Sequence, residues 1–225
     1  MSVAVHTRTP VPPVQFEKPN ALHPPIEAEI ACDFYRLTVE QYHAMINAGI
    51  LMDDDPVELL EGWLVTKMPK HPRHRGVIEQ LRWTIEKLLP PGWYIGSQDP
   101  VTTEASEPEP DLIVTKANLR TMRDRHPRPE EIALVVEVAD SSLRTDRRIK
   151  KRLYARSGIP VYWIVNLIDG VVEVYTDPTG PAAEPDYRSR RDYVRGETIP
   201  LMIDAARVGE IPVNEIFLEM PAPSE

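Results

Sequence analysis

The chain has 225 residues, of which 42% are hydrophobic and 27% are charged, and its formal net charge is −9. This length and composition are typical of one globular domain with a full core. No apolar stretch approaches the roughly 20 residues that span a bilayer, Cys32 has no second cysteine to pair with, and the N-terminus lacks a signal-peptide pattern. We therefore expect a cytoplasmic protein with no membrane partner, and the negative charge argues against a surface that is basic throughout.

The first third of the chain combines a proline-rich arm with two predicted helices and a hairpin. Residues 1–36 hold six prolines and no sustained periodicity, which predicts a flexible arm. Thr38 and Gln41 have the spacing of a capping box, so a helix is expected from there to about Ala48. Residues 57–68 are typical of a hairpin that turns at Glu61-Gly62. Apolar residues with a helical period then predict a second helix over residues 71–89.

The remainder of the chain alternates strand patterns with one basic helix. Strands are expected at 93–98, continuing across a bend at 100–103, and at 112–114, 132–138, 161–166, 171–176 and 187–194. Helices are expected at 144–157 and 213–218. This order predicts an α/β (mixed α+β) fold, in which helices flank one mixed central sheet.

Two of these strand regions carry a carboxylate that a buried strand does not tolerate alone. Asp111 directly precedes the run 112–114, and Glu137 lies inside the run 132–138. A buried charge without a partner is costly. Both carboxylates are therefore expected to converge on a cation or on a lysine from the helix at 144–157.

The basic helix offers a suitable lysine. Asp146, Lys150 and Tyr154 recur at steps of four, which places them along one helix face. Ile149 and Leu153 lie beside this stripe and are expected to pack the helix against the sheet. The stem of Lys150 can then be buried while its ammonium reaches the two carboxylates.

Two carboxylates and a lysine suit metal-dependent hydrolysis of a phosphodiester. The carboxylates would hold Mg²⁺ or Mn²⁺, which favour oxygen ligands, and the ammonium would stabilise charge in the transition state or orient the water. Basic residues on the same helix would contact the flanking phosphates. These are Arg144, Arg147, Arg148 and Lys151, the last of which points about 100° away from Lys150.

The residues alone leave other interpretations open. Asp111 could cap a turn, Glu137 could pair with an arginine of the helix, and Lys150 could be one more basic surface residue, because structural ion pairs resemble active sites. A zinc site at His71 and His74 lacks a third soft ligand nearby. A glycosidase would need aromatic platforms that the sequence does not offer.

Several segments, in order, resemble the Uma2 family of endonucleases within the PD-(D/E)XK nuclease superfamily. They are Leu37-Thr-Val-Glu-Gln-Tyr, Val57-Glu-Leu-Leu-Glu-Gly, Pro72-Arg-His, Ser106-Glu-Pro-Glu-Pro-Asp, Val135-Val-Glu-Val-Ala-Asp-Ser-Ser, Asp146-Arg-Arg-Ile-Lys and Tyr154-Ala-Arg-Ser-Gly-Ile-Pro-Val-Tyr-Trp-Ile-Val. The resemblance extends over residues 37–218. It implies a single nuclease domain there, followed by a tail at 219–225.

The resemblance implies a restriction-endonuclease-like core with Asp111 and Glu137 as metal ligands. Four further positions match ones that recur in the family, which implies that their side chains lie near the cleft. They are Glu61 or Glu58, His74, Gln98 and Tyr154. The superfamily motif Glu-x-Lys would place a lysine at position 139, where this chain has Ala139. We expect Lys150 to take over that role from the following helix.

The function expected from the sequence is therefore that of a Mg²⁺-dependent endonuclease acting on DNA. By analogy with enzymes that cut both strands of a duplex, a homodimer is expected. The alternative is a nucleic-acid-binding or regulatory module with little turnover, built on a nuclease scaffold. The absent Glu-x-Lys lysine and the negative net charge favour this alternative, whereas the two acids and Lys150 favour the enzyme.

Overall fold

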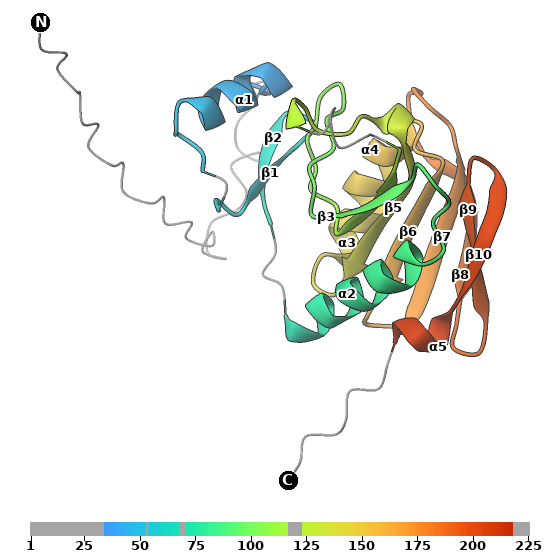
Figure 1. Cartoon of the computed structure of the whole chain (residues 1–225). Coiled ribbons are helices and arrows are strands. Elements are labelled where there is room, and N and C mark those ends of the chain that lie inside the picture. Colours follow the sequence, from blue (N-terminus) through green and yellow to red (C-terminus); the bar gives the residue numbers. More distant parts are fainter. Residues whose placement is uncertain (1–33, 53, 68–70, 117–122, 218–225) are drawn as a thin grey trace, which may run out of the picture.

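The computed structural model describes residues 34–52, 54–67, 71–116 and 123–217 (Figure 1). Most of the predicted arm at 1–36 and the predicted tail at 219–225 lie outside these described residues. In the described part of the chain, no helix is long and apolar enough to cross a membrane.

A six-stranded sheet forms the centre of the fold, with the strand order β3-β4-β5-β6-β7-β8. Strands β5 and β6 run parallel, and each of the other neighbouring pairs is antiparallel, which confirms the predicted mixed sheet. A parallel pair needs a crossover connection, and here the basic helix provides it. The strands are β3 (Tyr94–Ser97), β4 (Leu112–Thr115), β5 (Ile132–Ala139), β6 (Val161–Asn166), β7 (Val171–Pro178) and β8 (Tyr187–Tyr193).

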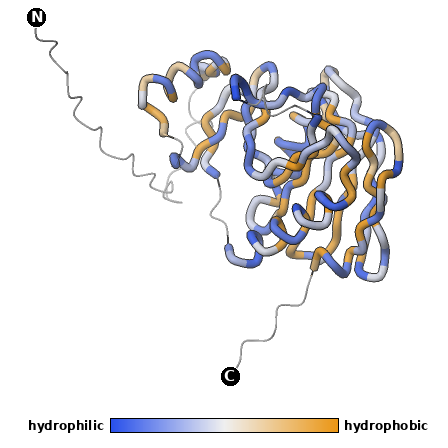
Figure 2. The backbone as a smooth tube through the Cα atoms, viewed as in Figure 1, coloured by the Kyte–Doolittle hydropathy of each residue, from blue (hydrophilic) through white to orange (hydrophobic). Residues whose placement is uncertain are grey.

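Successive residues of the central strands point to opposite faces of the sheet, and each face has its own core. Trp163 and Val165 of β6 pack with α2 (Pro72–Glu86) and α5 (Val213–Ile216), whereas Tyr162 and Ile164 pack with the crossover helix. Figure 1 shows α2 and the crossover helix on opposite sides of the sheet, and Figure 2 shows hydrophobic residues following the central strands.

The N-terminal elements confirm their sequence signals. Helix α1 (Val39–Asn47) begins with the capping box predicted from Thr38 and Gln41. The hairpin of β1 (Val57–Leu60) and β2 (Trp63–Thr66) turns at Glu61 and Gly62, which both have positive φ angles. Gly62 accommodates this backbone without strain.

Two features of the sheet region differ from the sequence prediction. Residues 100–103 form no strand, because their backbone hydrogen bonds are made within a local loop. The Val101 N–H donates to the carbonyl of Pro108, and the Thr103 N–H donates to the carbonyl of Ser106. A further hairpin, β9 (Thr198–Ile203) and β10 (Ala206–Pro212), was not predicted. Its turn is made by Asp204 and Ala205 with positive φ angles, so the usual glycine signal of such a turn is missing.

The crossover helix contains a wide π-type turn. It consists of α3 (Leu143–Thr145), the π-turn η4 (Asp146–Lys150) and α4 (Lys151–Arg156). The Lys151 N–H donates to the carbonyl of Asp146, five residues back. The extra residue in the turn changes which side chains face the sheet. Leu153 is 2% exposed as predicted, but Ile149 is 41% exposed, so its predicted packing against the sheet is wrong.

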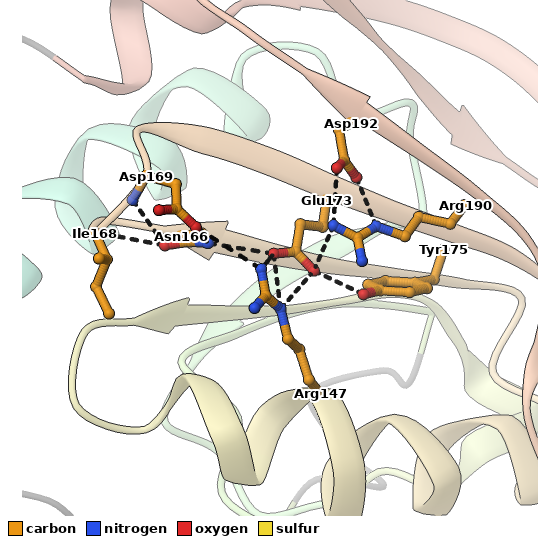
Figure 3. A network of polar contacts seen from close by, with 8 residues as sticks. All are labelled: Arg147, Asn166, Ile168, Asp169, Glu173, Tyr175, Arg190 and Asp192. Atoms are coloured by element: carbon orange, nitrogen blue, oxygen red, sulfur yellow. Dashed lines mark hydrogen bonds and ion pairs between the residues drawn. The ribbon is translucent and has the colours of Figure 1, made fainter.

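An ion-pair network joins the π-turn to strand β7 (Figure 3). The carboxylate of Glu173 is fully buried and accepts hydrogen bonds from Arg147 Nε at 3.0 Å, Tyr175 OH at 2.6 Å and Asn166 Nδ2 at 3.3 Å. Arg190 lies 3.4 Å from the same carboxylate. Burial would raise the pKa of Glu173, but the Arg147 and Tyr175 hydrogen bonds and the two arginine charges lower it overall. Arg147 therefore fastens the crossover helix to the sheet.

The π-turn predicts unequal effects for two apolar residues that a regular helix would bury together. Leu153→Ala should lower the free energy of unfolding by about 2–5 kcal/mol, because it removes buried core contacts. Ile149→Ala should change it by less than about 1 kcal/mol, because the side chain is largely in solvent. Urea unfolding of both variants provides the measurement, and equal losses would contradict the π-turn.

The Glu173 network predicts a pH-dependent effect of Arg147→Ala. Removing one partner of the buried carboxylate should cost about 1–3 kcal/mol at neutral pH, less than for a fully broken buried pair because Arg190 and Tyr175 remain. The pKa of Glu173 in the folded chain lies below its ordinary value of 4.5. Stability from this carboxylate is thus present above pH 4.5 and is lost as the pH falls further.

The loss caused by Arg147→Ala should accordingly shrink below pH 4.5, as measured by chemical unfolding at several pH values. Arg148→Ala is the matched control, since Arg148 is the exposed neighbour on the same turn. Its unfolding free energy should stay within about 0.5 kcal/mol of the wild type. A similar loss in both variants would show that the Glu173 network does not fasten the helix.

Candidate active site

One cavity brings together side chains from the β1–β2 hairpin, helix α2, the segment just before strand β4, strand β5 and the crossover helix. Its volume is about 110 Å³. The register of β4 and β5 pairs Leu112 with Val136, so Asp111 and Glu137 come to the same end of the strand pair. The ionisable residues that line the cavity and are themselves buried are Glu58, His74, Asp111, Glu137, Asp146 and Lys150.

Lys150 lies at the centre of this cluster and is 7% exposed. Its Nζ is 2.9 Å from Glu137 Oε1 and 3.3 Å from Glu58 Oε1. Burial alone would lower the pKa of Lys150, but the charges of Glu137, Glu58 and Asp146 raise it well above its ordinary value. The ammonium therefore stays protonated at neutral pH, and it can serve as a fixed positive charge but not as a general base.

Glu137 is held in place by two donors. Its Oε1 accepts hydrogen bonds from Lys150 and from the Tyr154 hydroxyl, the latter at 2.8 Å. Burial raises the pKa of Glu137, and the nearby carboxylates, Asp146 first among them, raise it further against the opposing effect of Lys150. An additional positive charge in the cavity would stabilise the ionised form of Glu137.

Asp111 is fixed through both its backbone and its side chain. Its Oδ2 accepts the Val138 N–H at 2.8 Å and lies 3.3 Å from His74 Nε2. Its carbonyl accepts the Gln98 N–H at 3.2 Å. The other ring nitrogen of His74, Nδ1, is buried and has no hydrogen-bond partner among the described residues. A buried polar atom of this kind is typical of a place where a water or a ligand group binds.

Asp146 completes the cluster from the first turn of the π-helix. Its Oδ2 accepts the Ser142 hydroxyl at 2.7 Å. Burial raises the pKa of Asp146 to about 6, although Lys150 and Ser142 lower it. The predicted sharing of one face by Asp146, Lys150 and Tyr154 leads to a common site, because Asp146 and Lys150 both line the cavity and Tyr154 contacts Glu137.

The donors present suit a hard divalent cation. Within the described ranges, no three His, Cys, Asp or Glu side chains already stand together as a complete metal site. Mg²⁺ needs only one or two protein carboxylates, because it keeps most of its waters. A cavity of about 110 Å³ has room for an ion with some of its water shell, since a water occupies roughly 30 Å³. Asp111 and Glu137 could supply the carboxylate oxygens.

Two residues suggested by the resemblance lie away from the cavity. Glu61 forms an ion pair with Arg156 at the turn of the hairpin, whereas Glu58, on the strand before it, binds Lys150. The Gln98 side chain is exposed and does not line the cavity, although its backbone contacts Asp111. Glu58 is the open alternative to Glu61, and its contact with Lys150 shows that Glu58 is the one that points into the cavity.

The four predicted phosphate contacts differ in their surroundings. Arg144 and Arg148 are exposed. Arg147 binds Glu173, and Lys151 Nζ lies 2.8 Å from Asp186. A phosphate at Arg147 or Lys151 would therefore compete with an existing carboxylate partner.

Comparisons with known proteins relate this chain to a family described as nucleases. The model of the Uma2 family, described as "Putative restriction endonuclease", matches residues 39–207. The fold is similar to the crystal structure of a "putative nuclease belonging to DUF820" from Anabaena variabilis ATCC 29413, with a TM-score of 0.59 and 16% sequence identity. The match covers 80% of this chain and 97% of that chain. The search of curated proteins found no match.

The family match spans most of the chain and includes Glu58, His74, Asp111, Glu137, Asp146 and Lys150. The solved structure supports the fold alone, because the sequence identity is low. The chain belongs to the Uma2 family of nuclease-like proteins.

Proposed function

We propose that this protein is a metal-dependent endonuclease that hydrolyses phosphodiester bonds in DNA. The observation that carries the proposal is the buried pair of Lys150 and Glu137, 2.9 Å apart, in the same cavity as Asp111. An ammonium and two carboxylates at the end of neighbouring strands suit phosphoryl chemistry, and the family match supports a nuclease-like activity.

Asp111 and Glu137 are the residues that would hold Mg²⁺ or Mn²⁺. When bound, the cation would polarise the phosphate and lower the pKa of an attacking water. Neighbouring residues of the chain hold these two carboxylates in fixed positions. The Val138 N–H and His74 orient Asp111, and the Tyr154 hydroxyl orients Glu137.

Lys150 would supply positive charge where negative charge develops on the phosphate. Its protonated state is secured by the surrounding carboxylates, and its position is fixed by Glu137 and Glu58. A preorganised charge in a partly dry cavity stabilises a transition state more than the same charge in water does. This assigns Lys150 the electrostatic role that the absent lysine at position 139 would otherwise have.

One observation favours the second candidate, a nucleic-acid-binding or regulatory module with little turnover. Lys150 already bridges two carboxylates, so a phosphate or a metal ion must compete with these contacts. If a phosphate or a metal ion does not displace these contacts, the protein would bind nucleic acid through its exposed arginines without cutting it.

Cleavage of supercoiled plasmid in Mg²⁺ or Mn²⁺ tests the assignment. Asp111→Asn, Glu137→Gln and Lys150→Met keep the approximate side-chain shapes and should each lower the rate by about 100-fold or more, because each removes a charge from the site. Glu86→Gln and Lys87→Ala are the matched controls. Both alter exposed residues at the C-terminal end of α2, away from His74 at its start, and neither lines the cavity, so both variants should cut like the wild type.

Each outcome of this assay is informative. Normal cutting by Lys150→Met would move the electrostatic role to another residue. Normal cutting by Asp111→Asn and Glu137→Gln would reject the site. DNA binding by the wild type with no cutting in any divalent metal would support the binding module instead.

Metal binding can be measured without activity through thermal unfolding. Mg²⁺ or Mn²⁺ should raise the melting temperature of the wild type, since a ligand at 100 times its Kd adds about 2.7 kcal/mol to stability. EDTA should reverse the shift. Asp111→Asn and Glu137→Gln should reduce it, and Glu86→Gln should retain it. An equal shift in all four proteins would place the metal elsewhere.

The homodimer remains a prediction, because the structure describes a single chain.

A further inference from the structure

A second, larger hollow lies beside the active-site cavity, between strand β2 and the outer face of the crossover helix. We refer to it as the hairpin–helix groove. Its volume is about 1040 Å³. The residues of its wall that matter most here are Arg36, Trp63, Leu64, Arg148, Ile149 and Arg152.

The groove continues from the active site along the same two elements. Val65 of β2 lines both hollows. On the helix, Lys150 faces the active-site cavity, whereas its neighbours Ile149 and Lys151 line the groove. A chain that leaves the active-site cavity along β2 therefore enters the groove directly.

Positive charge predominates in the groove. It is lined by six cationic residues and three acidic ones, namely Arg36, Arg147, Arg148, Lys151, Arg152 and Arg156 against Glu61, Glu184 and Asp186. Arg147, Lys151 and Arg156 have carboxylate partners. Arg148 and Arg152 are exposed, lie four residues apart on the helix, and form no ion pair within the described part of the chain. The two are suited to bind successive phosphates of one strand.

The groove also exposes apolar side chains, which phosphate binding alone does not explain. Trp63 is 37% exposed, with the Arg36 guanidinium 5.7 Å from its ring centroid and the Phe34 ring packed edge-on at 5.8 Å. Leu64 and Ile149 are also exposed, Ile149 because of the π-turn. An exposed aromatic ring next to arginines is typical of surfaces on which nucleic-acid bases stack.

We propose that the hairpin–helix groove binds single-stranded DNA and leads the strand past the active site, with Trp63 stacking against a base and Arg148 and Arg152 binding phosphates. In a duplex the faces of the bases are covered by their neighbours, so only an unpaired base can stack on Trp63. This inference rests on the proposed function and adds the form of the substrate, a DNA with unpaired bases next to the bond that is cut.

Binding measured in EDTA separates the groove from catalysis. The full chain is titrated into fluorescein-labelled oligothymidylate and, in parallel, into the same strand paired with oligodeoxyadenylate, with fluorescence anisotropy as the readout. The wild type should bind the single strand at least about tenfold more tightly than the duplex. Trp63→Ala should weaken single-strand binding about tenfold, because a stacked base contributes on that scale, and Trp63→Phe should retain most of the affinity.

Trp83→Ala is the matched control. Trp83 is 58% exposed and has Lys87 Nζ 3.6 Å from its ring centroid, but it belongs to α2 on the opposite face of the sheet. This variant should bind like the wild type. Arg148→Ala and Arg152→Ala should each reduce the slope of log affinity against log salt by about 0.7. These two carry the test if Trp63→Ala does not fold.

Equal affinity for single strand and duplex, or unchanged single-strand affinity in folded Trp63→Ala, would overturn the inference. Displacement of the DNA by polyglutamate at equal charge concentration would also overturn it, because the groove would then recognise negative charge alone. Failure of the groove proposal can be distinguished from failure of the endonuclease proposal. Trp63-dependent binding without cutting in any metal rejects the endonuclease but keeps the groove, whereas metal-dependent cutting with no single-strand preference does the reverse.

Discussion

The buried ammonium of Lys150 is the interaction on which this structure depends. Glu58 comes from the hairpin, Glu137 from the central sheet and Lys150 from the crossover helix, so one charge cluster joins three elements that are far apart in the sequence. Two buried carboxylates without this ammonium would be strongly destabilising. The fold therefore assembles the hairpin, the sheet and the helix around the same atoms that are proposed to do the chemistry, and stability and function constrain the same residues.

Contacts on both sides of Lys150 along the helix fix the direction of its side chain. On one side Arg147 binds the buried Glu173 of β7, and on the other side Tyr154 binds Glu137 on β5. A long flexible side chain loses rotamer entropy when it is fixed, so a rigid backbone on each side of Lys150 lowers the remaining cost of ordering it. Arg147, one of the residues predicted to contact phosphate, thus has a structural partner in Glu173.

Much of the fold was predictable because local signals agree with the final structure. The capping box at Thr38, the hairpin turn at Glu61-Gly62 and the strands expected at 161–166 and 171–176 are all present. The hairpin β9–β10 was not predictable, because its turn uses Asp204 and Ala205 in backbone conformations that usually indicate glycine. Without a glycine at the turn, the local sequence lacks the strongest short-range signal of a hairpin.

The candidate site was predictable in its carboxylates and lysine but not in its full composition. A charge in an apolar strand indicates that a partner exists, which points to Asp111 and Glu137. It does not say which hairpin residue faces inward, because Glu58 and Glu61 are both surrounded by apolar neighbours in the sequence. The spacing of residues in the sequence also does not reveal the π-turn. This turn leaves Lys150 directed at the cavity and turns Ile149 outward into the groove, so a single extra residue per turn shapes both the proposed catalytic surface and the proposed strand-binding surface.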